Sequence, residues 1–453
     1  MITSKDVFAK RKESIDEAYQ MALELMRSPT AGEWDIKAFC WCVIDIIKRD
    51  AANGNYQNLS HYRSQLESVA VDPSDDILAK GIRAALSLCS PGGREISEAK
   101  ALGREKRHAE AVAAYRKALA AGAADRETHT GFGWELYRHC KELMAAEPPR
   151  IEAAKRNLND YLKLDVEKPS LLHSCMLQIA GQLAGEKKLS MLTYSRLWNL
   201  DNLRTEDFQR FRTNDGQEFP SLAEKVIRLA SKEAISSSSG NNQEHILPYL
   251  HDAVERYPDN VYLKLDKAKL LLALGRNKEA LAFALAVTKE KLNDYWAWNL
   301  LGDVVLQMDK EAAIGCYCKA LSCPAEDKFT GPIRLKVAQY LLDSNDPEAA
   351  KFEIESIVRS REQEGLGVSG DVAALIAQPW FNTTAAATSN RNFYRSKFHA
   401  AESILFSNLP WIDACLGERY TVPGKDDKPK RKSIYGFRPS PPRAAFLSRG
   451  CVK

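Results

Sequence analysis

WAWNLLGDVVLQMDKEAAIGCYCKALSCP, residues 296–324, places large aromatic and small residues at regular helical intervals. The pattern is typical of two antiparallel helices joined by a short turn. Gly302 and Ala313 are small enough to lie where the two helices approach closely. Trp298 and Tyr317 are large enough to fill the gaps toward a neighbouring pair. A lone helical hairpin cannot bury its apolar stripe, so the pattern predicts that copies of the hairpin stack.

The same pattern recurs on both sides of this stretch. A preceding unit begins at Pro258, and a following unit covers residues 333–358. Equivalent positions lie about 34 residues apart, which is the period of a helix-turn-helix repeat. Upstream the pattern is weaker, although Ala111 and Tyr115 occupy positions expected in the second helix of such a unit. Residues 171–235 read as helices that match the repeat poorly.

The order Trp, Leu-Gly, Ala, Tyr, Ala-Leu and Pro resembles the tetratricopeptide repeat (TPR) family over roughly residues 247–360. The resemblance implies an all-α fold. It would be an α-solenoid of stacked antiparallel hairpins that form a TPR-like superhelix, followed by a short irregular or β-prone tail. The residues expected to pack the hairpins together are Ala280, Trp298, Leu301, Gly302, Ala313, Tyr317, Ala320, Ala111 and Tyr115.

Composition and periodicity divide the chain into six segments. The first three are an N-terminal array of degenerate hairpins at 1–235, a polar linker at 236–246 and a C-terminal TPR block at 247–365. The others are a linker at 366–388, a capping helix at 389–412 and a basic, Pro-rich, partly disordered tail at 413–453. The first linker is predicted from SSSSGNNQ, which lacks periodicity. The capping helix is expected to seal the last hairpin, because the end of an array must be covered.

The resemblance to the TPR family also implies a binding surface. In that family the first helix of each repeat contributes to a concave wall that binds partner proteins. The equivalent positions here are Tyr262, Leu265, Lys269, Trp296, Asn299 and Asp303. They alternate apolar and charged groups, which suits a partner's helix or extended peptide. The other interpretation is that Trp296 and Leu265 only pack against neighbouring hairpins. Family members that clamp C-terminal carboxylates carry Lys and Asn here, whereas Asp303 would repel a carboxylate.

The C-terminal part carries a basic cluster at Lys428, Lys430, Arg431 and Lys432. These side chains would contact nucleic-acid phosphates if nucleic acid is a partner, and otherwise they form a solvated tail.

A second resemblance precedes this cluster. The motifs that carry it are Asn392-Phe393-Tyr394, Ala401-Glu402, Leu405-Phe406 and Leu409-Pro410-Trp411. They resemble a segment that follows the repeats in TPR proteins of bacterial conflict systems, where a small OB-like β-barrel comes next. The resemblance implies an alternative function, a nucleic-acid-associated adaptor of a bacterial defence system that uses the basic tail.

Motifs for catalysis are missing from the sequence. No phosphate-binding loop, hydrolase elbow or zinc-protease motif occurs. Cys316 and Cys318 would point about 200° apart on a helix, so they cannot ligate one metal ion. His139 and the cysteine after it do not by themselves establish a thiol nucleophile. Glu353 and Glu355 are expected to be solvated on different helical faces. We therefore expect no catalytic residue, metal or cofactor, with an enzyme of unfamiliar site as a third interpretation.

The overall composition is that of an ordinary globular protein. The 453 residues are 45% hydrophobic and 27% charged, and the net charge of +4 gives no reason to expect nucleic acid over the whole surface. The N-terminus lacks a secretory pattern, and no run of about 18 apolar residues predicts a membrane span. Ten cysteines in such a chain favour reduced thiols. We expect a cytoplasmic scaffold for a protein or peptide partner.

Overall fold

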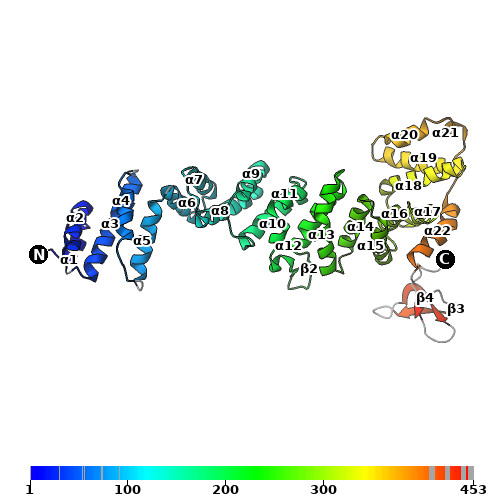
Figure 1. The fold of residues 1–453 in the computed structure, drawn as a ribbon. Helices are drawn as coiled ribbons and strands as arrows, with labels where there is room; N and C mark the ends of the chain where they lie inside the picture. Colours follow the sequence, from blue (N-terminus) through cyan, green and yellow to red (C-terminus); the bar gives the residue numbers. More distant parts are fainter. Residues whose placement is uncertain are drawn as a thin grey trace. The chain divides into compact units, whose positions relative to one another are not determined.

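The computed structural model describes residues 2–29, 31–53, 55, 57–72, 75–90, 92–407, 414–423, 429–439 and 445–446. The chain folds into two compact units, Met1–Pro258 and Asp259–Lys453. Each unit is built from helical hairpins that follow one another along the chain (Figure 1).

The regular elements among the described residues of the N-terminal unit are helices and one short β-hairpin. Its helices are α1 (Ser4–Lys10), α2 (Ile15–Met26), α3 (Glu33–Asn53), α4 (Leu59–Glu67), α5 (Asp76–Leu88), α6 (Gly93–Arg104), α7 (His108–Ala120), α8 (Arg126–Ala145), α9 (Ile151–Leu162), α10 (Leu171–Gly185), α11 (Met191–Trp198), α12 (Leu222–Ile235) and α13 (Gly240–Arg256). Between α11 and α12 lie the 3-10 helices η1 (Leu200–Asn202) and η2 (Thr205–Phe208) and the strands β1 (Phe211–Arg212) and β2 (Glu218–Phe219).

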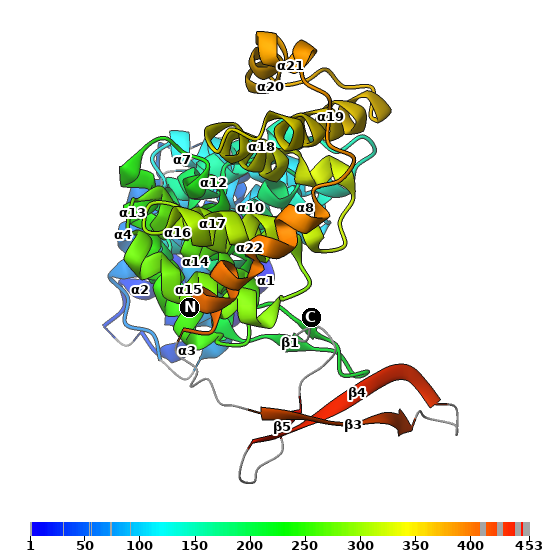
Figure 2. The same cartoon turned by 90° about the vertical axis from the view of Figure 1, so that its right-hand side faces the viewer.

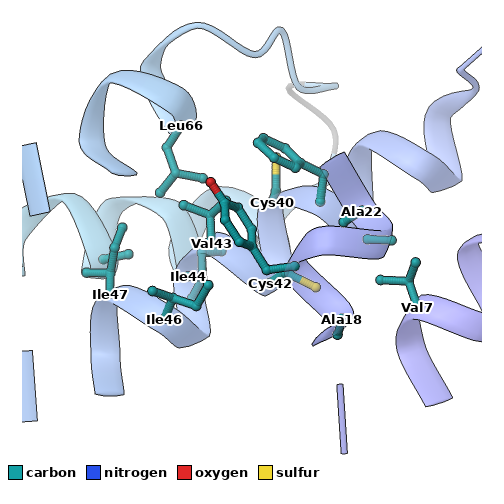
Figure 3. Packing of buried hydrophobic residues seen from close by; sticks show 14 of the residues in the cluster. Val7, Ala18, Ala22, Cys40, Cys42, Val43, Ile44, Ile46, Ile47 and Leu66 are labelled. Atoms are coloured by element: carbon teal, nitrogen blue, oxygen red, sulfur yellow. The ribbon is translucent and has the colours of Figure 1, made fainter. Parts of the chain in front are cut away.

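Hairpins in this unit stack in sequence order. The pairs α6–α7, α8–α9, α10–α11 and α12–α13 each pack together, and α7, α9 and α11 each contact the helix that begins the next pair. At the start of the chain, α1 to α5 bury an apolar cluster to which α3 contributes most of the side chains (Figure 3). Cys40, Cys42, Val43 and Ile46 of α3 are all inaccessible to solvent. This packing supplies the apolar burial that a single hairpin lacks.

The C-terminal unit repeats the arrangement. Its helices are α14 (Val261–Ala273), α15 (Asn277–Glu290), α16 (Tyr295–Val305), α17 (Lys310–Ser322), α18 (Asp327–Asp343), α19 (Pro347–Gln363), α20 (Gly370–Ile376), α21 (Pro379–Thr383) and α22 (Arg391–Leu405). The pairs α14–α15, α16–α17 and α18–α19 form hairpins, and α15 and α17 contact the first helix of the next pair. Helices α14 and α16 begin 34 residues apart. The prediction of an all-α, TPR-like stack of hairpins is confirmed.

Local sequence signals define the ends of these helices. Asp309 and Asp346 cap α17 and α19 by accepting hydrogen bonds from backbone N–H groups three residues later, and Pro347 occupies the first turn of α19. The turns that follow α14 and α18 contain Gly275 and Asn345, both with a left-handed backbone. Glycine and asparagine tolerate the left-handed conformation best. This conformation ends the first helix of each hairpin, and the chain then reverses direction into the second helix.

The close approach within the α16–α17 hairpin requires a glycine. A Cβ atom on Gly302 would lie 2.5 Å from the ring of Tyr317 on the facing helix. The same device occurs in the N-terminal unit, where a Cβ on Gly131 of α8 would lie 2.6 Å from the hydroxyl of Tyr115 on α7. A tyrosine ring thus occupies the space that another side chain would need, and the two helices pack at short range.

Helix α22 turns back along the stack and packs on α17 (Figure 2). A Cβ atom on Gly315 of α17 would lie 2.6 Å from the carbonyl oxygen of Lys397 and 2.9 Å from the backbone nitrogen of Ala401, so the two backbones are in contact. Salt bridges from Lys319 to Glu402 and from Lys397 to Glu311 hold the edges of this interface. Helix α22 thus lies within the segment 389–412 predicted as a capping helix, of which residues 408–412 are outside the described structure. It covers the second helix of the middle hairpin, whereas the prediction placed it over the end of the last one.

A buried carboxylate ties α22 to the last hairpin. Glu353 of α19 is inaccessible to solvent, and its carboxylate accepts hydrogen bonds from Arg334, Asn390 and Tyr394. The expectation that Glu353 is solvated is wrong, because its partners come from α18, the residue before α22 and α22 itself. Asn390 uses its side chain here and on the Ala349 carbonyl rather than as a helix cap.

Both predicted linkers contain helical structure. The polar stretch 236–246 provides only a short turn, because α13 already begins at Gly240. This helix packs on α12, and its residues Ile246, Leu250 and Ala253 are buried. The boundary between the units falls after Pro258 instead.

The second linker, 366–388, contains α20 and α21. Val372 is buried, and Trp380 and Phe381 pack against the same apolar cluster on the last hairpin. Lys351 of α19 donates hydrogen bonds to the carbonyl oxygens of Phe381 and Thr384. This segment is therefore part of the folded unit.

Beyond α22 the described residues form β-structure rather than a disordered tail. Strands β3 (Ala414–Pro423), β4 (Pro429–Pro439) and β5 (Ala445–Phe446) make an antiparallel sheet in the order β3–β4–β5. The register pairs Tyr420 with Ile434 and Gly436 with Phe446. The sequence prediction of a β-prone tail holds for these residues, and the prediction of disorder is wrong for them.

One buried histidine links two hairpins of the N-terminal unit. His173 of α10 is inaccessible to solvent and stacks on Trp198 of α11 at a centroid distance of 4.0 Å. Its Nε2 atom lies 3.2 Å from the Trp198 carbonyl and must donate, so Nδ1 accepts from the Tyr161 hydroxyl at 2.8 Å. Burial lowers the pKa of His173 to about 4, and the Trp198 carbonyl opposes that shift. Lys168 and Asp207 are the charged groups that act on it.

We predict that replacing Gly315 with Ala destabilises the C-terminal unit by about 1–3 kcal/mol, because the added methyl group would force α22 away from α17. The matched control is Gly331→Ala in α18, where the nearest atom lies 4.0 Å from the new Cβ. That change should stabilise the unit by up to about 1 kcal/mol through helix propensity. Urea unfolding followed by circular dichroism measures the free energy of unfolding of both variants. Equal free energies of unfolding would contradict the close contact between α17 and α22.

We predict that the N-terminal unit loses stability as the pH falls. His173 has a lowered folded-state pKa, so the unfolded chain binds its proton first. The stability is fully present above the unfolded pKa of about 6.5 and is lost progressively down to about pH 4. Between pH 7 and pH 5 the loss should be about 2 kcal/mol. His173→Gln should reduce this pH dependence to the part that comes from His139 and His245, whose pKa values burial also lowers. The exposed His61→Gln should retain it in full.

Candidate interaction surface

The first helices of the C-terminal unit carry aromatic rings at their N-terminal ends. Tyr262 of α14 stacks with Trp296 of α16 at a centroid distance of 6.2 Å. The neighbouring Tyr295 stacks with Phe329 of α18 at 6.4 Å, with ring planes 11° apart. Tyr262 is 44% exposed and Phe329 is 50% exposed. Tyr295 and Trp296 are partly buried. We call these four residues the aromatic row, which consists of two stacked pairs at the N-terminal ends of three successive first helices.

Sequence reasoning named Tyr262 and Trp296 but missed Tyr295 and Phe329. The signal was available, because residues 262 and 296 are one repeat apart and so are 295 and 329. A single repeat period therefore places each pair at equivalent positions of consecutive helices.

The other predicted wall positions differ in accessibility. Lys269 is exposed, and Asn299 and Asp303 are partly buried. Leu265 is 9% exposed and is one of the buried residues of α14, so it contributes little to the surface. The predicted packing residues, including Ala280, are all buried.

Asp303 is the centre of a polar network that joins three helices. Its Oδ1 atom accepts a hydrogen bond from the hydroxyl of Tyr317 on α17 at 2.7 Å and pairs with Nζ of Lys336 on α18 at 2.5 Å. Asn299 contacts both Asp303 and Lys336. Burial and the nearby Asp303 raise the pKa of Tyr317, so its hydroxyl stays protonated and donates. From the sequence alone, Asp303 is expected to repel a partner's carboxylate. In the structure the ammonium group of Lys336 pairs with Asp303 and offsets this repulsion.

Paired charges border the aromatic row. Lys264 forms a salt bridge with Glu290, and Lys328 binds Glu326 while lying 5.1 Å from the centroid of Phe329. The exposed strip is thus apolar at its centre and polar at its edges, an arrangement common at protein interfaces.

The candidate thiols are unsuited to chemistry. Cys316, Cys318 and Cys140 are inaccessible to solvent, and burial raises the pKa of both Cys316 and Cys140 to about 12. A protonated thiol is a poor nucleophile and metal ligand. Among the residues that the structure describes, no group of three or more His, Cys, Asp and Glu side chains is placed to hold a metal ion.

The basic cluster lies only partly within the described structure. Lys430, Arg431 and Lys432 belong to β4, whereas Lys428 is outside the described residues. Contact between this cluster and nucleic acid stays a prediction.

Comparison with known proteins gives one family match and several structural similarities. Residues 261–401 match a family model described as a domain of unknown function (DUF7017). The match begins where α14 begins and ends inside α22, so it covers the three hairpins together with most of the helix that packs on α17. No curated protein matches the sequence.

The solved structures are similar only at a coarse level. A human IFIT1 dimer with m7Gppp-AAAA aligns at a TM-score of 0.32 and 14% identity, covering 89% of each chain. A structure of Naa15/Naa10 bound to HypK-THB aligns at a TM-score of 0.26 and 13% identity, over 90% of this chain and 58% of that one. The APC/C hetero-tetramer Cut9–Hcn1 gives 0.22 and 12%, over 90% and 85%. These values are too low to transfer a ligand or a partner.

Within the described part of the chain, none of the helices combines the length and the apolar character needed to cross a membrane.

We predict that Asp303→Ala destabilises the C-terminal unit by about 1–3 kcal/mol, because the hydroxyl of the buried Tyr317 and the ammonium group of Lys336 lose their shared acceptor. The exposed Lys269→Ala should change stability by less than about 0.5 kcal/mol. Urea-unfolding midpoints distinguish the two. A cost of Asp303→Ala no greater than that of Lys269→Ala would show that the network does not support the fold.

Proposed function

We propose that the protein is a non-catalytic scaffold that binds a partner's helix or extended peptide on the first helices of its C-terminal unit. The observation that carries this proposal is the aromatic row, in which the large rings of Tyr262 and Phe329 remain exposed at its two ends. On the second-helix side the chain's own α22 already covers α17. The first helices are therefore the face that the fold leaves open to a partner.

The chemistry of the aromatic row fits a peptide ligand. Aromatic side chains bury a large area at low entropic cost, and they dominate the energetics of most protein interfaces. Aliphatic groups of a partner would cover Tyr262 and Phe329, and the exposed Lys269 would attract an acidic residue beside them. Asn299 and Asp303 hold the helices that present the rings. By resemblance to the TPR family, this is the role of first helices in such repeats.

A second candidate function is a nucleic-acid-associated adaptor of a bacterial conflict system. The observation that favours it is the placement of Lys430, Arg431 and Lys432 on a strand of an antiparallel sheet, which would hold the three residues in fixed register. Binding through phosphates would weaken steeply with added salt, and loss of residues 424–453 would abolish it. Absence of nucleic-acid binding by the intact chain at low salt would exclude this candidate.

The test of the scaffold proposal compares three forms of the intact chain in affinity purification from the source cells. We expect the wild type to retain partners that a Tyr262→Ala, Phe329→Ala, Lys269→Glu variant loses, because these exposed residues form the contact but not the fold. The control is Phe211→Ala, which removes a 65% exposed ring from the N-terminal unit. Circular dichroism checks that the variants are folded.

The partners should return with the control and disappear with the triple variant. Recovery of the same partners, in the same amounts, with all three forms would show that the aromatic row is not the binding surface.

A further inference from the structure

A surface pocket in the N-terminal unit lies outside the proposed partner-binding surface. It encloses about 500 Å³ and is formed by α7, α8 and one face of α9. Three of its lining side chains are the cations Arg116, Arg156 and Lys163, against the single carboxylate of Asp160. The pocket therefore has an excess of positive charge, although the chain as a whole is nearly neutral.

The guanidinium group of Arg116 is held in place from one side. Its Nε and Nη2 atoms donate to Asp160 at 3.0 and 2.8 Å, and Nη2 also donates to the amide oxygen of Asn157 at 3.1 Å. Asn157 is only 2% exposed, so its amide is a buried polar group whose position is fixed. Within the described residues Nη1 has no hydrogen-bond partner, and it remains available for a ligand.

The same asparagine also orients His139. Arginine can only donate, so the Asn157 oxygen faces Arg116 and its Nδ2 donates to Nδ1 of His139 at 3.0 Å. The imidazole then carries its proton on Nε2, and His139 is one of the residues that line the pocket. Burial lowers the pKa of His139, which keeps this neutral form at pH 7. A buried amide thus positions two donors at once, which is the preorganisation expected of a binding site.

The remaining donors are unengaged or weakly engaged. Arg156 is exposed and forms no ion pair among the described residues, and Lys163 lies 3.8 Å from Asp160 with 77% of its side chain exposed. With Arg116 and His139 they surround the pocket with donors, while its one carboxylate is already occupied by Arg116. The complementary ligand must supply several acceptor oxygens and more than one negative charge.

We propose that this pocket binds a phosphomonoester group. A phosphomonoester carries about −1.5 to −2 charges at pH 7 and three acceptor oxygens, and arginine forks match its geometry. A single carboxylate has too few oxygens to engage Arg116, Arg156 and Lys163 together. No Phe, Tyr or Trp side chain lines the pocket, and the ring of His139 is held by Asn157, so the group to be recognised is the phosphate itself.

Isothermal titration calorimetry of the intact chain with inorganic phosphate and phenyl phosphate tests this site. We expect both to bind, and Arg156→Ala, Lys163→Ala to weaken binding by about tenfold or more, because each lost cation removes a charge-assisted hydrogen bond. The control is Lys117→Ala, Lys155→Ala, which removes the same charge from α7 and α9 outside the pocket. The control should bind like the wild type.

Three results would overturn the proposal: no binding of either phosphate to the wild type, equal weakening in the control, or binding of the diester dimethyl phosphate as tightly as phenyl phosphate. A comparison of ribose 5-phosphate with a phosphoserine peptide distinguishes a small metabolite from a modified protein as the carrier of the group. Binding of either that is lost in the pocket variant supports the site.

Discussion

The contact of Tyr317 with Gly302 is the interaction on which the C-terminal unit depends. The tyrosine ring occupies the space of a missing side chain, so the two helices of the hairpin pack at a distance that no other residue at position 302 permits. Its hydroxyl then donates to Asp303, and Asp303 also binds Lys336 in the next hairpin. One side chain therefore fixes both the spacing within a hairpin and the attachment of its neighbour. This spacing sets where the aromatic rings at the ends of the first helices lie.

The second constraint is the buried charge of Glu353. A carboxylate without access to water costs several kcal/mol unless its hydrogen bonds are made, and here Arg334, Asn390 and Tyr394 all donate to it. Arg334 precedes α20 and α21 in the sequence, whereas Asn390 and Tyr394 follow them. The last two can donate to Glu353 only if the chain returns to the last hairpin after α21. Contact of Gly315 with Ala401 then brings α22 onto α17. The two sides of the C-terminal unit therefore differ. On one side the chain itself covers a hairpin, and on the other the first helices are open.

The sequence predicts the part of this fold that is periodic. Gly302 and Tyr317 recur within a repeat of known length, so their packing follows from spacing alone. The partners of Asp303 and Glu353 do not follow, because they depend on which turns of three separate helices face each other in space. The prediction of a linker at 366–388 is wrong for a related reason. Its composition is that of a loop, but Val372 becomes buried against a hairpin whose exposed apolar patch the sequence does not show.

Repeat construction explains how one chain can carry two chemically different surfaces. Each hairpin contacts mainly its neighbours, so a polar substitution in one hairpin costs stability locally and leaves distant hairpins unchanged. Asn157 illustrates the point, since a buried amide in α9 is tolerated because Arg116 and His139 satisfy it within the adjoining helices. The aromatic row belongs to the region matched by the family model, whereas this pocket lies outside it. Because the aromatic row and the pocket share no residues or helices, substitutions at one should leave the side-chain contacts at the other intact.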